Sequence, residues 1–221
     1  MGRHRDLRGF NDDEVNISCV FIARTGVDTL DKLQLPILLG TNRKLRKSIF
    51  AAKWVVQEME KRPDIQTRLF DASDFALPHD DYGQEIKHLF PEWREAIVKA
   101  DGLVIVSPEY NHGYPGVLKA VLDLLLKEYI HKCVAFVGVS AGPWGGTRAI
   151  EAMVTMVREL GLTVTFTDLN FPHIQKKFDA EGKLLDHAYE QRVKDFLDEL
   201  VWMSSVLKWG RKNLPSKYHV N

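Results

Sequence analysis

The stretch Ser107-Pro108-Glu109-Tyr110-Asn111-His112-Gly113-Tyr114-Pro115-Gly116 decides how the rest of the chain is interpreted. An apolar run at residues 103–106 leads into it, and apolar residues at helical spacing over 117–127 lead out of it. The stretch itself is polar, aromatic and rich in Gly and Pro, which is typical of a strand-to-helix turn that meets a ligand. Such turns lie at the carboxyl ends of parallel strands, where ligands bind in open α/β sheets.

Four further apolar segments, each followed by a helical pattern, flank this central strand. The predicted strands are residues 36–39, 66–70, 103–106, 134–139 and 163–167, and the predicted helices include 92–99 and 186–208. Alternation of strand and helix predicts an α/β fold with a doubly wound, five-stranded parallel sheet and helices on both faces. Right-handed crossovers favour the flavodoxin-like strand order 2-1-3-4-5. The loops at residues 40–48, 107–116 and 140–146 then meet at one edge of the sheet.

The first of these loops predicts a phosphate site. It joins the hydroxyls of Thr41 and Ser48 to four cations, Arg43, Lys44, Arg46 and Lys47, at the start of a helix. Helix N-termini favour anions, and cations in the first turn oppose the helix dipole unless an anion lies among them. The loop matches neither the nucleoside-triphosphatase motif Gly-x-x-x-x-Gly-Lys-Ser/Thr nor the dinucleotide motif Gly-x-Gly-x-x-Gly. A solvated basic turn is the alternative.

The other two loops predict a slot for a planar ring. Tyr110 and Tyr114 offer aromatic surfaces, and Asn111 offers both a donor and an acceptor. The glycine-rich loop at 140–146 allows close approach of its backbone, with Trp144 either as a wall of the pocket or as an interface anchor. A phosphate site and a planar slot at the same switch point fit FMN.

Three motifs resemble the NADPH-dependent FMN reductase family of flavodoxin-like oxidoreductases, which includes quinone, azo-dye and chromate reductases. They are Gly40-Thr41-x-Arg43-x-x-Arg46-x-Ser48, the opening stretch extended to Gly116-x-Leu118-Lys119-x-x-x-Asp123, and Ser140-x-Gly142-x-x-Gly145-Gly146. The resemblance covers residues 36–200. One departure is Leu45, where the family often has Gly.

The resemblance implies which residues bind FMN. Those implied for the phosphate are Thr41, Arg43, Arg46 and Ser48. Those implied for the isoalloxazine ring are Pro108, Glu109, Tyr110 and Asn111 on one side and Ser140, Gly142 and Gly145 on the other. No catalytic acid or base is assigned, because a flavin itself carries the hydride chemistry. No metal is assigned, because His79, His88 and His173 show no metal-ligand spacing.

The implied activity is hydride transfer from NADPH or NADH to bound FMN and then, by a ping-pong mechanism, to a small-molecule oxidant. That oxidant is a quinone, free flavin, azo dye or metal ion. The alternatives are a flavodoxin-like electron carrier and a flavin-binding regulatory protein. Two features count against a carrier. The phosphate loop at residues 40–48 contains Arg, whereas the phosphate loops of flavodoxins are of the Thr/Ser-Gly type. The net charge of the chain is zero, whereas electron carriers are usually acidic. The family also implies a homodimer or homotetramer.

Composition sets the remaining expectations. The 221 residues carry 30 Lys and Arg and 30 Asp and Glu, so no net field attracts nucleic acid or an anionic membrane. No apolar segment is long enough to insert into a bilayer. Two scattered cysteines form no disulfide framework, which favours a reducing cytoplasm. The basic N-terminus runs into acidic residues rather than an apolar core, so it does not indicate a signal peptide.

One domain is expected, a flavodoxin-like FMN-binding domain over residues 35–221, preceded by an N-terminal extension of unknown structure, residues 1–34. Residues 1–16 are charged and suggest an arm, and residues 17–23 suggest a strand or a short packed segment. Whether the extension joins the main domain, packs on a partner subunit or stays peripheral is left open.

Overall fold

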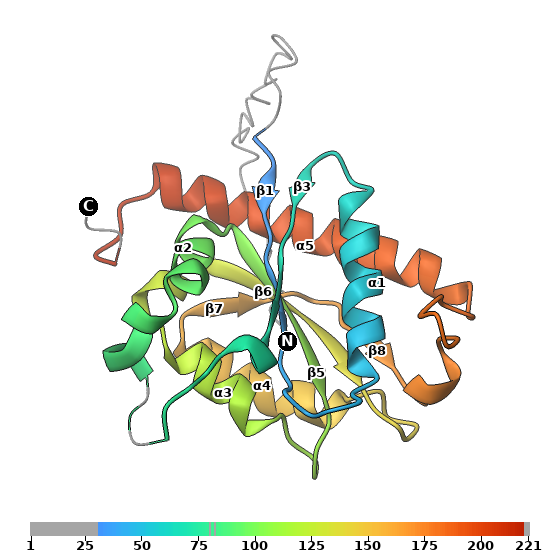
Figure 1. The fold of residues 1–221 in the computed structure, drawn as a ribbon. Coiled ribbons are helices and arrows are strands. Elements are labelled where there is room, and N and C mark those ends of the chain that lie inside the picture. The colour runs from blue at the N-terminus through green and yellow to red at the C-terminus, as the bar shows by residue number, and fades with distance from the viewer. Residues whose placement is uncertain (1–30, 80, 82, 219–221) are drawn as a thin grey trace, which may run out of the picture. The chain divides into compact units, whose positions relative to one another are not determined.

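A computed structural model describes residues 31–79, 81 and 83–218 (Figure 1). The arm and the segment predicted within residues 1–30 lie outside the described residues. The central six-stranded sheet has the order β4-β2-β5-β6-β7, with β8 also paired to β6, and every pair is parallel. Its strands are β2 (Ile37–Leu39), β4 (Leu69–Asp71), β5 (Gly102–Pro108), β6 (Lys132–Val139), β7 (Leu162–Val164) and β8 (Leu169–Phe171). The doubly wound α/β class is confirmed.

The number of strands differs from the prediction because predicted strands are interrupted. β1 (Leu33–Gln34) and β3 (Ile65–Gln66) pair with each other ahead of β2 and β4, as a separate two-stranded sheet. The predicted strand at 163–167 is wrong over its second half. β7 ends at Val164 opposite Val134, and β8 starts at Leu169 opposite Val137. Between these points β7 and β8 use two more residues than β6, so the chain bulges there and leaves Phe166 exposed.

Helices cover both faces of the sheet (Figure 1). They are α1 (Ser48–Glu60), α2 (Pro91–Lys99), α3 (Gly116–Asp123), α4 (Thr147–Glu159) and α5 (Ala188–Asn213). Short 3-10 turns are η1 (Ala72–Asp74), η2 (Gly83–Leu89), η3 (Lys127–Tyr129) and η4 (Ile174–Lys176). Side chains of β5 alternate between two cores, because Val104 and Val106 pack with α1 and α5, whereas Leu103 and Ile105 pack with α2, α3 and α4.

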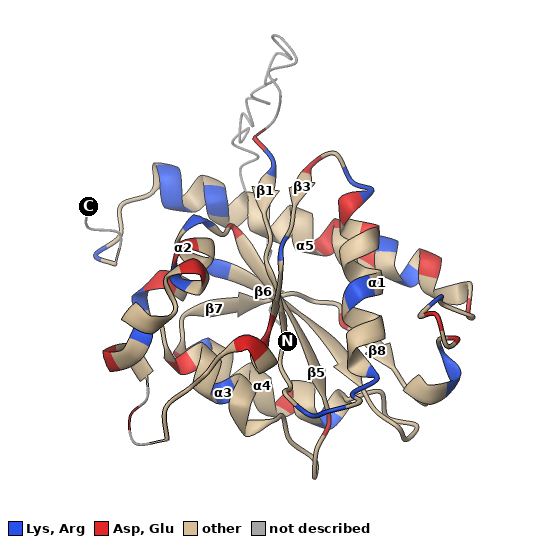
Figure 2. Cartoon of the chain, in the orientation of Figure 1, with Lys and Arg blue, Asp and Glu red and all other residues tan. Residues whose placement is uncertain are grey.

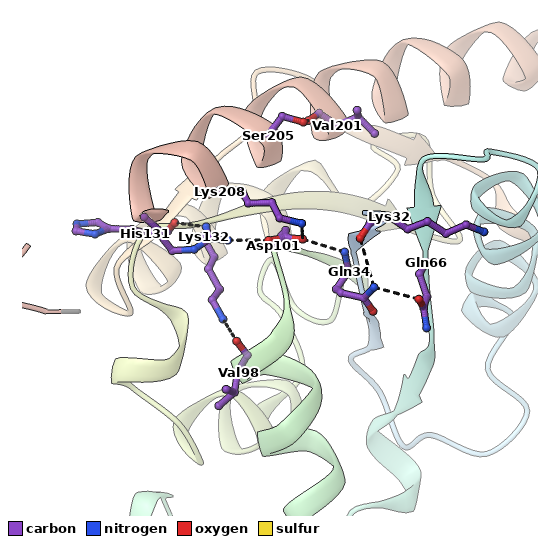
Figure 3. Close-up of polar contacts among 11 residues, drawn as sticks. Lys32, Gln34, Gln66, Val98, Asp101, His131, Lys132, Val201, Ser205 and Lys208 are labelled. Atoms are coloured by element: carbon purple, nitrogen blue, oxygen red, sulfur yellow. Dashed lines mark hydrogen bonds and ion pairs between the residues drawn. The ribbon is translucent and has the colours of Figure 1, made fainter. Parts of the chain in front are cut away.

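The edge of the sheet at the amino ends of β5 and β6 is closed by a cluster of buried charges (Figure 3). Asp101 accepts hydrogen bonds from the Gln34 backbone N–H at 3.1 Å and from Lys208 Nζ and Arg211, each at 2.9 Å. Lys132 is also buried, and its ammonium donates to the backbone oxygens of Ile97 and Val98, the latter at 3.0 Å. Both carbonyls lie in the last turn of α2, where the Ile97 oxygen also accepts the Ala100 N–H at 3.2 Å, so the lysine adds a donor to carbonyls at the end of the helix.

The opposite edge carries the three loops singled out in the sequence. They follow the carboxyl ends of β2, β5 and β6, which lie side by side in the sheet. This topology brings the three loops to one place although they are far apart in the sequence. In the described part of the chain, no helix combines the length and apolar character that crossing a bilayer requires.

Candidate functional site

The first loop leads from β2 into α1 and leaves the start of that helix without a cap. The N-cap residue Lys47 makes no side-chain hydrogen bond to the helix, and the first turn contains no acidic residue. Ser48 begins the helix, and its buried hydroxyl has no hydrogen-bond partner within the described ranges. A basic stretch runs into this helix end (Figure 2). Free N–H groups, an unpaired hydroxyl and nearby cations together form a site suited to an anion.

Arg46, by contrast, is engaged within the protein. Its guanidinium forms an ion pair with Asp71 at the end of β4 and donates to Ser73 Oγ at 3.1 Å and to the Arg43 carbonyl at 3.2 Å. Both carboxylate and guanidinium are mostly buried. These contacts fix the path of the loop, while the Arg46 Nε remains buried and unpartnered among the described residues. Arg43 remains exposed, with its guanidinium carbon 5.7 Å from the centre of the Tyr110 ring.

Leu45 is strained in this loop. Its φ is 57°, in the left-handed region, and its side chain is 97% exposed. A side chain with a Cβ disfavours this conformation, whereas Gly adopts it readily. The family often has Gly at this position, so the departure places Leu45 where the backbone conformation favours glycine.

The second loop begins as a tight hairpin rather than an open turn. Tyr110 and Gly113 exchange two backbone hydrogen bonds of 2.9 and 3.0 Å across Asn111 and His112. Those two central residues have φ values of 51° and 65°, the pattern of a type I′ turn. The Tyr110 hydroxyl lies 3.0 Å from Thr41 Oγ1, and the Thr41 oxygen also accepts the Arg43 N–H at 3.3 Å. The first two loops are thus joined by side chains 69 positions apart.

Glu109 lies at the start of this loop and is tied to α4. Its backbone N–H donates to the Val139 carbonyl at 3.0 Å, and its side chain is nine-tenths buried. Arg148 lies 3.4 Å from one carboxylate oxygen, donates to His112 Nε2 at 3.2 Å and stacks on Trp144 at 5.0 Å. The second carboxylate oxygen is buried with no partner in the described part of the chain. A ligand N–H donor would satisfy this oxygen.

The third loop is shaped by Ser140. Its hydroxyl accepts the Gly145 N–H and donates to the Gly142 carbonyl, both at 2.9 Å. Gly145 and Gly146 have φ values of 59° and 83°, and a Cβ on Gly146 would lie 2.5 Å from the Val139 nitrogen. A Cβ on Gly142 would meet nothing within 4 Å, so open space lies beside the backbone there.

The structure brings the predicted residues to one edge of the sheet but gives them unequal freedom. The side chains of Arg46 and Ser140 make internal contacts, whereas Ser48 and Glu109 each carry a buried oxygen with no partner among the described residues. Sequence reasoning missed Asp71 and Arg148. A signal for Arg148 was available, because it stands two residues after Gly146, at the second position of a predicted helix.

FMN fits these residues. Its phosphate needs hydroxyl and N–H donors beside cations, which the Ser48 hydroxyl, the uncapped start of α1 and Arg43 supply. Its ring offers an N–H donor, which suits the Glu109 oxygen that lacks a partner among the described residues. Its ring also has a flat face, which suits the open space beside the Gly142 backbone.

Comparison with known proteins places the chain in a family. The family model of NADPH-dependent FMN reductases matches residues 34–176. The NADPH azoreductase of Bacillus sp. (strain OY1-2) is 31% identical over 187 residues, covering 82% of this chain and 98% of the relative. The NAD(P)H-dependent FMN reductase PA1204 of Pseudomonas aeruginosa is 32% identical over 155 residues, covering 64% of this chain and 80% of the relative.

A solved structure shows the same fold. FerB, a flavoenzyme NAD(P)H:(acceptor) oxidoreductase from Paracoccus denitrificans, is similar with a TM-score of 0.61 at 21% identity. The match covers 78% of this chain and 97% of FerB. With the family match over residues 34–176 and the loops built as described, the chain belongs to the NADPH-dependent FMN reductase family.

Proposed function

We propose that the three loops hold FMN and that the protein passes hydride from NADPH or NADH, through this flavin, to a small-molecule acceptor. Membership of the family makes the chain an FMN-dependent NAD(P)H oxidoreductase. Relatives named as reductases of azo compounds and of 2-hydroxy-1,4-benzoquinone support azo dyes and quinones as acceptors. The relatives favour an enzyme over the electron carrier or regulatory protein that the sequence left open.

The observation that carries the proposal is the Ser48 hydroxyl at the uncapped start of α1, which has no hydrogen-bond partner in the described part of the chain. Thr41, Arg43 and Ser48 surround the phosphate end in this proposal. Arg46 acts through its ion pair with Asp71, which holds the loop in place. An anion at this helix end is also stabilised by the helix dipole.

The ring end is assigned to the second and third loops. Pro108, Glu109, Tyr110 and Asn111 line one side, and Ser140, Gly142 and Gly145 line the other. Glu109 accepts a ring N–H, Tyr110 is held in place by Thr41, and Ser140 keeps the glycine loop open by its two internal hydrogen bonds. When bound, FMN supplies the hydride acceptor and donor, so the protein's task is binding and orientation.

The second substrate meets an exposed rim formed by Trp144, Arg148 and His112. Arg148 is partly exposed and stacks on Trp144, which offers a flat surface and a positive charge together. We assign this rim to the incoming dinucleotide and acceptor, which use the same face in turn. No residue is assigned as a catalytic acid or base.

Two further expectations, the oligomeric state and the cellular compartment, complete the proposal. The protein is a homodimer or homotetramer in the cytoplasm. The described Cys133 is a free, buried thiol, which is compatible with a reducing compartment.

The test is spectroscopic and kinetic. The purified protein should show a flavin spectrum that NADPH bleaches under anaerobic conditions, and it should turn over with a quinone as acceptor. A protein that carries FMN but shows no turnover contradicts the enzymatic proposal.

A pair of variants tests the phosphate end. Arg43→Ala should weaken FMN binding about tenfold, because a charge-assisted hydrogen bond is lost. Lys44→Ala removes the same charge from the same exposed loop and is the matched control. Equal FMN dissociation constants for the two variants would remove Arg43 from the phosphate site.

A further inference from the structure

Arg148, at the second position of α4, joins three parts of the candidate site. Its guanidinium lies 3.4 Å from a Glu109 carboxylate oxygen and donates to His112 Nε2 at 3.2 Å, both in the loop after β5. It also stacks on the Trp144 ring, 5.0 Å from its centre, in the loop after β6. The Arg148 side chain is 39% exposed, so it does not fill the core. Its contacts instead hold a positive charge beside Glu109.

The Glu109 carboxylate depends on this charge because it is largely removed from water. Its side chain is 10% exposed, and its second oxygen is buried without a partner in the described ranges. A buried carboxylate is costly unless it is paired or hydrogen-bonded. Within the residues that the structure describes, its ion pair is the one with Arg148. The two side chains therefore form a charge pair, one oxygen of which is left for a ligand.

The place of this pair against FMN follows from the chemistry of the ring. The oxidised isoalloxazine has a single N–H, on its pyrimidine half, so a carboxylate that accepts from the ring lies against that half. Hydride transfer from NAD(P)H brings two electrons and one proton to the ring and releases NAD(P)⁺. The ring thus gains a negative charge, spread over the pyrimidine half, unless it takes up a second proton. Glu109 opposes this charge, and Arg148 compensates for Glu109.

We propose that Arg148 is a positioning residue that raises the reduction potential of bound FMN, by offsetting the negative charge of Glu109 through their ion pair. Loss of the guanidinium leaves the buried carboxylate uncompensated, which raises the free energy of the reduced, negatively charged ring more than that of the oxidised ring. This role rests on the proposed function, because it requires FMN with Glu109 at its ring N–H.

The experiment measures the midpoint potential of FMN bound to the full chain, anaerobically against a reference dye, and the dissociation constant of oxidised FMN by flavin fluorescence. Arg148→Gln should weaken the binding of reduced FMN about tenfold more than that of oxidised FMN, which lowers the two-electron potential by about 30 mV. Glu109→Gln keeps an acceptor oxygen without the charge and should raise the potential by a similar amount. The double variant should return close to the wild-type potential.

Two further variants separate charge from structure. Arg148→Lys keeps the positive charge and should leave the potential close to that of the wild type. Arg158→Gln removes the same charge from an exposed position in the last turn of α4, and it is the matched control, with no change expected. Far-UV circular dichroism confirms that each variant is folded.

The outcomes distinguish this role from the proposed function. A wild-type chain that binds no FMN overturns both. A chain that binds FMN with the same potential in wild type and Arg148→Gln overturns only the role of Arg148. So would shifts of the same sign in Arg148→Gln and Glu109→Gln, an equal shift in Arg158→Gln, or a potential in Arg148→Lys as low as in Arg148→Gln. Loss of FMN binding in both Arg148 variants would also overturn it, since the residue would then serve binding rather than the potential.

Discussion

Lys132 offers a sharp test of the energetics of this fold, because a buried ammonium makes stability depend on pH. Burial lowers the pKa of Lys132 to about 8 from its ordinary 10.5, with the positive charge of Arg211 as the second cause. The carboxylates of Asp101 and Glu128 act in the opposite direction but are weaker. The difference corresponds to about 3 kcal/mol that the folded state loses by holding the charge.

The direction of the pH dependence of stability follows from how many protons the folded and unfolded states each bind. Below pH 8 the lysine is protonated in both states, so the full cost of burying the charge is present. Between pH 8 and 10.5 the unfolded chain binds the proton while the folded chain releases it, and stability therefore rises with pH. The contribution of Lys132 should increase by about 2 to 3 kcal/mol from pH 7 to pH 10.

The assay is urea unfolding of the wild type and of Lys132→Met at several pH values between 7 and 10. The unfolding free energy of the wild type minus that of Lys132→Met should rise by about 2 to 3 kcal/mol between pH 7 and pH 10. Its value at pH 7 is less informative, since methionine removes the buried charge but also removes a donor from the carbonyls of Ile97 and Val98, of which Ile97 keeps the Ala100 N–H. Lys99→Met, at an exposed lysine of α2, controls for net charge. Parallel curves for wild type and Lys132→Met would refute the reasoning.

Three further predictions concern single residues. Burial raises the pKa of the Cys133 thiol from 9.0 to about 12. Between pH 9 and 12 the folded state therefore keeps a proton that the unfolded state releases. The contribution of Cys133 to the free energy of unfolding should fall over this range by up to about 1.4 kcal/mol per pH unit. Cys133→Val should remove that slope in urea unfolding under reducing conditions. Leu45→Gly should raise the thermal midpoint, with a gain of about 0.5 to 1 kcal/mol, because the left-handed strain is relieved and almost no buried surface is lost; a lower midpoint would contradict the strain. Ser48→Ala should weaken FMN binding about tenfold in a flavin-fluorescence titration without a loss of stability, because the hydroxyl makes no internal hydrogen bond to any described residue.

The fold class was predictable because its signals are local. Apolar runs such as residues 103–106 mark buried parallel strands, and the spacing of strands and helices limits the topology to few choices. The bulge between β7 and β8 was not predictable, because the alternating residues Thr163 to Thr167 satisfy a strand pattern whether or not they pair. Its presence depends on the register against β6, which only the packed sheet sets.

The site was predictable in its location and less so in its internal contacts. Loops after adjacent parallel strands must meet, so Thr41, Tyr110 and Ser140 could be placed together from order alone. The carboxylate that neutralises Arg46 comes from Asp71, 25 positions away at the end of another strand. No pattern in the first loop identifies that partner. The roles of these residues toward FMN stay predictions until binding is measured.

The closed hairpin of the second loop has a consequence for how a ligand is received. Tyr110 and Gly113 hold each other by two backbone hydrogen bonds, and Thr41 fixes the Tyr110 side chain. The loop is therefore ordered by its own contacts before any ligand arrives, and binding need not supply the entropy of ordering it. Amide exchange at Tyr110 and Gly113 should then be nearly as slow in the flavin-free protein as in the flavin-loaded one. Such preorganisation favours rapid reloading after FMN is lost.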